Sequence, residues 1–199
     1  MCAPACQLIL ASRSPRRRQL LHDAGYRFEV IEPDPAAEQG QELRESPREM
    51  VTRLARQKAG DVARHVDRGI ILGCDTVVEC HGHVLGKPVD RDDARRMLLM
   101  LRSRVHHVYS GVCLWRRPDD EMLTRVDVTK LRMDHRSDRE LDSYLATDEW
   151  QGKAGAFGYQ DQHDWLHVIR GSESNVVGLP MELLAAMLDE LARRQLRPD

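Results

Sequence analysis

The chain has 199 residues, which is enough for one large domain with a sizeable buried core. Hydrophobic residues make up 41%, charged residues 31%, and the formal net charge is −2, which excludes a disordered chain and a general nucleic-acid-coating surface. No apolar run approaches the roughly 20 residues of a membrane-spanning helix, so we expect a soluble cytoplasmic protein. The function must therefore be sought in local groups of residues.

The cysteines predict a reducing environment. They are odd in number, lie mostly in apolar strand-like runs and form no Cys-x-x-Cys pair, so we expect reduced structural thiols. They are Cys2, Cys6, Cys74, Cys80 and Cys113.

The first predicted elements are a buried strand over residues 8–11 and a helix that follows it directly. Ser14 is a suitable N-cap, and a proline occupies the first helical position. A strand running into a helix N-terminus favours anions, yet Arg16 and Arg17 occupy the first turn against the helix dipole. We interpret this placement as a phosphate site, with a solvated basic turn as the alternative.

Residues 26–31 alternate as a strand does, and an acidic loop follows. Ser46 and Glu49 then form a capping box, and apolar residues up to Val62 mark one face of a helix. Lys58 lies near the apolar edge of that helix, where it could reach into a cleft or extend along the surface towards solvent.

An apolar, β-branched run over residues 69–78 carries Asp75 near its middle. Burying an unpaired charge costs several kcal/mol, so an aspartate here requires a partner or a function. Two interpretations follow from the pattern: Asp75 is the reactive centre of a phosphate-handling site, or residues 73–76 form a turn between two short strands.

The chain then turns back over residues 80–83 and returns to Lys87. This lysine stands between a glycine, which permits close backbone approach, and a proline, which fixes the exit of the chain. We therefore expect Lys87 to be held towards a ligand.

The second half of the chain is predicted to consist mainly of structural helices and strands. We predict a helix over residues 90–102, antiparallel strands over 107–115 and 122–133, a helix that opens with a capping box at Ser137, a strand over 165–169, a crossing segment over 171–180 and a final helix over 181–195.

A loop over residues 150–160 contains three glycines and three aromatic residues. It could bring its backbone close to a flat ligand and offer the amide of Gln160, or it could be a plain connector. Neither G-x-G-x-x-G nor the P-loop pattern occurs, so dinucleotide oxidoreductases and P-loop NTPases are disfavoured.

Four separated segments together resemble the Maf family of nucleoside triphosphate pyrophosphatases. The resemblance covers essentially the whole chain in order. The segments are residues 10–17, residues 54–59, residues 73–76 with 86–88, and residues 153–160 with 175–180.

The resemblance implies a single α/β domain over residues 1–199, with a mixed elongated sheet, flanking helices and a nucleotide-binding cleft between two lobes. It also implies hydrolysis of the α–β phosphoanhydride of a nucleoside triphosphate, which yields the monophosphate and pyrophosphate. A homodimer stays open, and no nucleic-acid or membrane partner is expected.

The functional residues of the family carry over onto matching positions of this sequence. The resemblance implies catalysis by Asp75, as general base, metal ligand or both, and Mg²⁺ or Mn²⁺ binding by Glu38 with Asp75. The implied phosphate-binding residues are Ser12, Arg16, Arg17, Lys58 and Lys87, and the implied specificity residues are Arg16, Thr76 and Gln160.

The specificity positions resemble the branch that acts on dTTP and UTP. The branch acting on 7-methyl-GTP tends to have Trp, Gln and Glu there, and a neutral glutamine suits a pyrimidine because it can both donate and accept hydrogen bonds.

The sequence departs from the family pattern at two places. The acidic pair usual after the second strand is reduced here to Glu38, with Asp34 as the alternative, and Glu173 stands where an aromatic residue is common.

Two other functions are alternatives to the hydrolysis of dTTP and UTP. One is the same reaction on 7-methyl-GTP or another non-standard nucleotide. The other is a regulatory, nucleic-acid-binding or cell-division protein that uses the basic residues 13–18, which the near-zero net charge disfavours.

Overall fold

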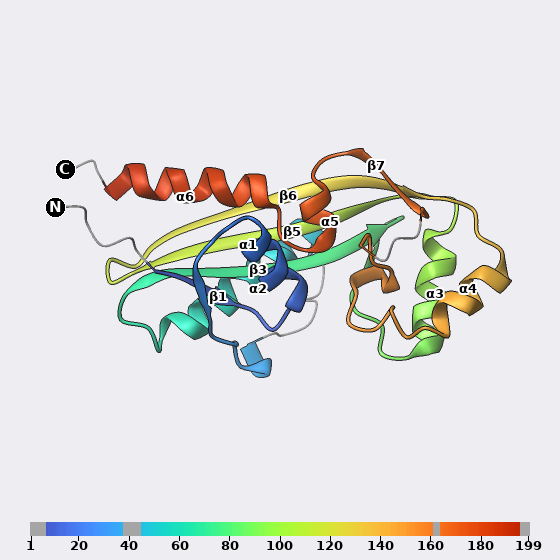
Figure 1. Ribbon diagram of the computed structural model, residues 1–199, viewed down its shortest axis with the longest axis horizontal. Helices are drawn as coiled ribbons and strands as arrows, with labels where there is room; N and C mark the ends of the chain where they lie inside the picture. The colour runs from blue at the N-terminus through green and yellow to red at the C-terminus, as the bar shows by residue number, and fades with distance from the viewer. Residues whose placement is uncertain (1–6, 38–44, 161–163, 196–199) are drawn as a thin grey trace.

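A seven-stranded mixed sheet forms the centre of the computed structural model, which describes residues 7–37, 45–160 and 164–195 (Figure 1). The strand order is β2-β1-β3-β5-β6-β7, and β4 pairs with β3. Strands β2, β1 and β3 are parallel, whereas the pairs from β3 to β7 are antiparallel. The strands are β1 Leu8–Ala11, β2 Phe28–Val30, β3 Gly69–Cys80, β4 His83–Leu85, β5 Val105–Arg117, β6 Glu121–Met133 and β7 Leu166–Arg170.

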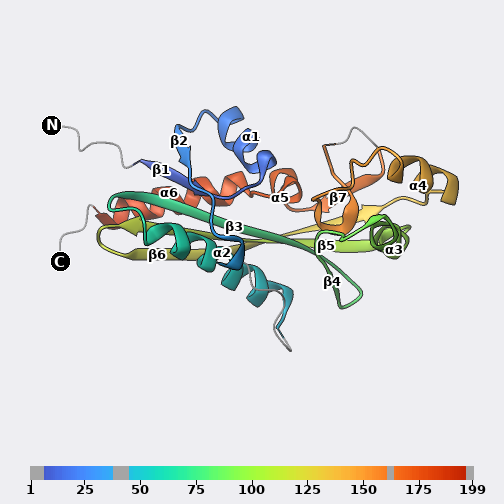
Figure 2. The same ribbon diagram turned by 90° about the horizontal axis from the view of Figure 1, so that it is seen from below.

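Helices cover both faces of this sheet. Figure 2 shows α1 and α6 on one face and α2 on the opposite face, with α3 and α4 at the far end. The helices are α1 Pro15–Asp23, α2 Pro47–Ala63, α3 Arg91–Leu101, α4 Asp138–Leu145, α5 Glu173–Val177 and α6 Met181–Gln195, and Pro35–Ala37 and Ala154–Ala156 form short 3-10 turns. The predicted α/β class is confirmed.

Local sequence signals account for most helix starts. The Ser46 hydroxyl accepts a hydrogen bond from the Glu49 N–H at 3.3 Å, and the Glu49 carboxylate accepts from the Ser46 N–H at 2.9 Å. Ser137 and Glu140 form the same reciprocal pair, so both predicted capping boxes are confirmed. The predicted crossing over 171–180 is partly wrong, because a short helix, α5, begins there after the N-cap Ser172.

The core divides into two lobes along the continuous sheet. One cluster lies at the end covered by α3 and α4 and includes Val78, Leu98 and Trp165. The other lobe has a cluster on each face of the sheet, one containing Leu72 and the other containing Ile71. Adjacent residues of one strand thus serve opposite faces, as the pleat requires.

Strand β3 has a gap in its pairing. Along one edge it pairs with β1 over residues 70–73 and with β4 over residues 78–80, while β5 pairs along the other edge. Within the described chain, no strand pairs with residues 74–77 on the first edge. The predicted turn at 73–76 is therefore wrong, because these residues belong to one unbroken strand.

Glycines allow α2 to pack directly on the sheet. A Cβ added at Gly73 would lie 2.2 Å from the Ala55 carbonyl oxygen, and one at Gly111 would lie 2.2 Å from the Val51 carbonyl oxygen. Since these contacts are with backbone, no side-chain movement relieves them. The close approach sets the depth at which α2 lies behind β3.

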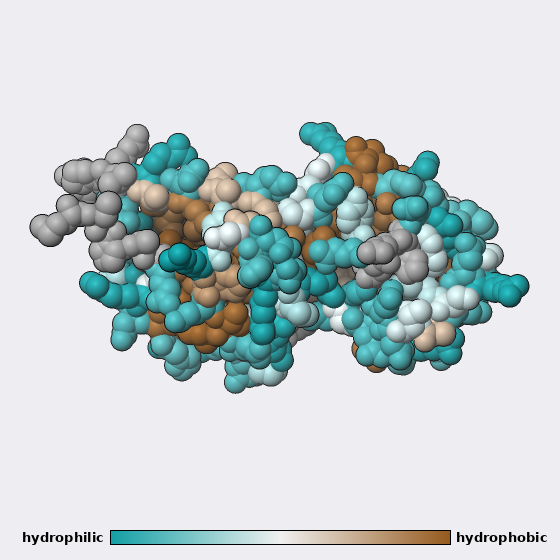
Figure 3. Space-filling view, viewed as in Figure 1, coloured by the Kyte–Doolittle hydropathy of each residue, from teal (hydrophilic) through white to brown (hydrophobic). Residues whose placement is uncertain are grey.

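Figure 3 shows a face that is mostly hydrophilic, with hydrophobic residues gathered mainly in its left half. Among the described residues, no helix is both long enough and apolar enough to cross a membrane.

We predict that Gly111→Ala destabilises the fold, because the new methyl group must displace the backbone of α2. The expected loss is about 2 kcal/mol or more, seen as a fall in Tm of about 4 °C or more in thermal unfolding. Gly86→Ala is the matched control, because a Cβ at Gly86 meets nothing within 4 Å. Equal Tm values for the two variants would contradict the proposed close packing.

Candidate functional site

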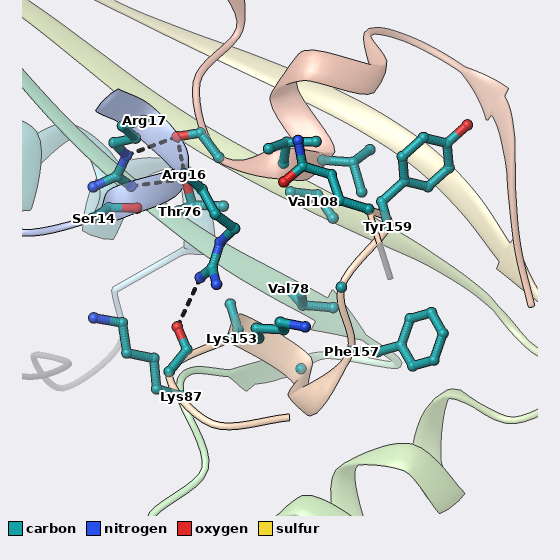
Figure 4. A pocket seen from close by; sticks show the side chains of 18 of the residues that line it. Ser14, Arg16, Arg17, Thr76, Val78, Lys87, Val108, Lys153, Phe157 and Tyr159 are labelled. Carbon is teal, nitrogen blue, oxygen red and sulfur yellow. Dashed lines mark hydrogen bonds between the residues drawn. The ribbon is translucent and has the colours of Figure 1, made fainter. Parts of the chain in front are cut away.

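A cavity of about 320 Å³ opens beside the unpaired edge of β3 (Figure 4). It collects the predicted site residues from separate parts of the chain: Ser12, Arg16, Arg17, Lys58, Asp75, Thr76, Lys87 and Gln160. Glu38 lies outside the described residues. The alternative acidic residue, Asp34, lines a different hollow beside α2, where its backbone N–H donates to the Asp61 carboxylate.

Asp75 forms an ion pair at the wall of the cavity. The Lys58 Nζ donates to Asp75 Oδ1 at 2.6 Å, and the two side chains are 6% and 13% exposed. The interpretation of Lys58 as a surface side chain is therefore wrong, and the one that places it in a cleft is confirmed. No hydrogen bond to Asp75 Oδ2 is found among the described residues, and no other carboxylate belongs to the described residues that line the cavity.

Arg17 is buried and joins three distant segments. Its Nε donates to the Gly178 carbonyl oxygen at 2.8 Å, one Nη to the Ser12 hydroxyl at 3.1 Å and the other to the Thr76 hydroxyl at 3.1 Å. The Thr76 hydroxyl also lies 2.8 Å from the Ser110 hydroxyl. The structure therefore places Thr76 beside the Arg17 guanidinium, within a network of polar groups.

The other basic groups gather at the same end of the cavity. Figure 4 shows Arg16 and Lys87 extending into a shared space, and the Arg16 guanidinium donates to the Gly152 carbonyl oxygen at 2.8 Å. Ser14 stands at the N-cap of α1, but its side chain makes no capping hydrogen bond. This end of the cavity thus combines a helix N-terminus with guanidinium and ammonium groups, an arrangement suited to a polyanion.

The opposite end of the cavity is mostly apolar. Val78 and Val108 stand opposite each other on β3 and β5, and Tyr159 and Gln160 come from the glycine-rich loop. Burial, followed by a hydrogen bond with Glu173, raises the pKa of Tyr159. Glu173, the departure from the family pattern, therefore contacts a residue at the edge of this chamber.

His106 is a cavity residue that the sequence did not indicate. It is 2% exposed, and burial lowers its pKa to about 4. The predicted strand began one residue later, at His107, and so left His106 out. Its alternation with the buried Val108 and Ser110 is the one signal that could have found it.

The cysteine prediction is confirmed where the structure describes it. Cys74, Cys80 and Cys113 are buried free thiols, and burial raises the pKa of each. Cys2 and Cys6 lie outside the described residues. Among the described residues, no group of three or more His, Cys, Asp or Glu side chains is arranged to hold a metal ion.

We predict that His106 makes the folded protein sensitive to acid. Between pH 6.5 and about pH 4 the unfolded chain protonates this histidine and the folded chain does not, so stability falls as the pH falls through this range. The full difference corresponds to roughly 3 kcal/mol. In urea unfolding at pH 7 and pH 4.5, His106→Gln should lose less stability than the wild type, whereas the exposed His22→Gln should follow the wild type. A His106→Gln curve parallel to the wild type would refute this.

The fold and the cavity define a class of protein: an α/β protein with a cavity at an open strand edge, where the described lining combines several basic side chains with the Asp75 carboxylate. The chain belongs to the Maf family, since the sequence model described as "Maf-like protein" matches residues 7–191.

Several relatives are similar over nearly the whole chain. A dTTP/UTP pyrophosphatase of Rhodopirellula baltica is 53% identical over 92% of this chain and 81% of its own length. A protein of the same name from Dictyoglomus thermophilum is 41% identical over 93% of this chain and 96% of its own length. A solved nucleoside-triphosphatase, a dITP/XTP pyrophosphatase of Mycobacterium abscessus, aligns with a TM-score of 0.43 and 15% identity over 97% of this chain and 100% of its own.

Proposed function

We propose that this protein is a nucleoside triphosphate pyrophosphatase that hydrolyses dTTP and UTP to the monophosphate and pyrophosphate. The observation that carries the proposal is the position of Asp75, a carboxylate on the wall of a cavity lined by basic groups, with one oxygen paired to Lys58. A carboxylate so placed suits the activation of water beside a bound triphosphate. The names of the Rhodopirellula and Dictyoglomus relatives support this choice of substrate.

The basic groups divide into two roles. Arg16 and Lys87 extend into the cavity and would neutralise the triphosphate and the charge that develops on pyrophosphate as it leaves. Arg17 donates hydrogen bonds to Ser12, Thr76 and Gly178, so it would hold the loop before α1 in its conformation. Its positive charge would also favour the bound phosphates. Lys58 would orient Asp75.

The reaction is a displacement at phosphorus. The oxygen of a water molecule forms a bond to the α-phosphorus, and the bond from that phosphorus to the α–β bridging oxygen breaks. The bridging electron pair leaves with pyrophosphate, and Asp75 accepts the proton released by the water. The stabilising charges are held in place before the reaction, so little reorganisation is needed.

A divalent cation fits this chemistry. Mg²⁺ is usually bound through one or two carboxylates together with phosphate oxygens, and Asp75 provides a carboxylate on the cavity wall. We propose that Asp75, together with Glu38, holds Mg²⁺ or Mn²⁺. When bound, the ion would supply additional neutralisation of the phosphate oxygens.

We propose that the base occupies the apolar end, next to Gln160. This residue lines the cavity together with Val108 and Tyr159, and its amide can both donate to and accept from a pyrimidine edge. Arg16 and Thr76 complete the proposed specificity set, although Thr76 lies beside the Arg17 guanidinium. We further propose that residues 1–199 form one catalytic domain and that the reaction takes place in the cytoplasm, in keeping with the buried free thiols.

We predict that Asp75→Asn leaves a folded protein that releases pyrophosphate from dTTP or UTP about 100-fold more slowly or worse, because the variant cannot accept a proton. Pyrophosphate release and circular dichroism would check activity and folding together. Glu79→Gln, on the same strand but outside the cavity, is the matched control and should keep wild-type activity. Retained activity in Asp75→Asn would end the proposal. A Lys58 variant is less informative, since an unpaired buried carboxylate can cost about 3–5 kcal/mol of stability.

We predict that a chelator abolishes pyrophosphate release and that added Mg²⁺ or Mn²⁺ restores it, because an ion held by Asp75 would help to neutralise the phosphate charge. The assay would use a panel of triphosphates, with dTTP and UTP expected to react faster than 7-methyl-GTP or purine triphosphates. Faster hydrolysis of 7-methyl-GTP would instead favour the other branch of the family. Salt-sensitive oligonucleotide binding without hydrolysis would favour a nucleic-acid-binding protein.

A further inference from the structure

His106 lies on the same face of the sheet as the cavity's apolar end. Thr76 stands opposite Ser110, and Val78 opposite Val108, on neighbouring strands β3 and β5. His106 follows two residues further along the face of β5 that carries Val108 and Ser110, about 13 Å from Ser110 by the rise of a strand. A nucleotide with its phosphates near Thr76 and Arg16 would thus extend its base towards His106.

The tautomer of His106 follows from its hydrogen bond. Its Nδ1 lies 3.4 Å from the Arg104 carbonyl oxygen, which can only accept, so Nδ1 carries the proton. Because burial lowers the pKa of His106 to about 4, the ring is neutral near pH 7 and its Nε2 is a bare acceptor. No hydrogen bond to Nε2 is found among the described residues.

The surroundings of His106 would allow its Nε2 to distinguish uracil from cytosine. His106 pairs with Leu131 across the strands, and Leu101, Val108 and Phe157 line the same chamber. Gln160 cannot by itself distinguish uracil from cytosine, because its amide can rotate to present either a donor or an acceptor. The His106 ring cannot switch between donor and acceptor in this way while its Nδ1–H donates to the Arg104 carbonyl oxygen.

We propose that His106 reads the base: its Nε2 accepts the hydrogen bond of the N3–H of uracil or thymine and rejects cytosine, whose N3 is itself an acceptor. The inference rests on the proposed function and extends it from Gln160 to a second, fixed reader of the pyrimidine edge. It assigns to His106 a contact with substrate rather than a role in the chemical step.

The first test uses wild-type protein and an analogue that lacks the N3–H. In 3-deaza-UTP a ring C–H replaces the N3–H and the C4 oxygen becomes a hydroxyl, so kcat/KM should fall about 10- to 100-fold relative to UTP. His106→Phe, which has no acceptor, should hydrolyse UTP and 3-deaza-UTP equally. His107→Gln, a neighbour outside the cavity, should keep the wild-type ratio. Equal kcat/KM values for UTP and 3-deaza-UTP in the wild type would overturn the inference.

The second test does not depend on a variant that folds. With ¹⁵N-labelled histidine in the wild-type protein, the unprotonated Nε2 resonance of His106 should shift on addition of UMP and not on addition of CMP. An Nε2 signal unmoved by saturating UMP would overturn the inference. If wild-type protein releases no pyrophosphate from UTP or dTTP, the proposed function fails and this inference with it; release without either N3 effect overturns the inference alone.

Discussion

The buried guanidinium of Arg17 holds the site together. A guanidinium buried away from water needs hydrogen-bond acceptors for its N–H groups. Arg17 donates to Ser12, Thr76 and Gly178, which belong to the start, the middle and the end of the chain. The loop after β1, the open edge of β3 and the end of α5 are thereby fixed against one another. All three segments line the cavity, so Arg17 holds together one part of its wall.

The gap in the pairing of β3 then determines what the cavity can do. Consecutive residues of a strand point to opposite faces, so Asp75 lies on the side where α2 supplies Lys58, whereas Thr76 lies on the side of α1 and Ser110. At a fully paired position these groups would be separated by the sheet. At an open edge they border the same cavity, which brings the Asp75 carboxylate and the loop before α1 to one space.

The sequence predicted the parts of the structure that depend on near neighbours. The capping boxes at Ser46 and Ser137 join residues three apart, and the antiparallel pair β5–β6 follows from two alternating runs around a short turn. The sequence could not choose between the interpretations of Lys58, since its partner Asp75 is 17 residues away. It missed α5 because a serine cap and a short apolar run are equally compatible with a connector.

By itself, the sequence determined the class of fold and the order of its elements, and, through segments that resemble one family, it indicated a set of site residues that all line one cavity where the structure describes them. Only the tertiary structure decided how side chains meet: that Lys58 is buried against Asp75, that Arg17 donates to Gly178, and that the buried His106 lines the cavity. Helix and strand signals depend on contacts a few residues apart. Burial, charge pairing and the protonation state of a histidine depend on which segments, distant in the sequence, pack over a side chain and exclude water from it.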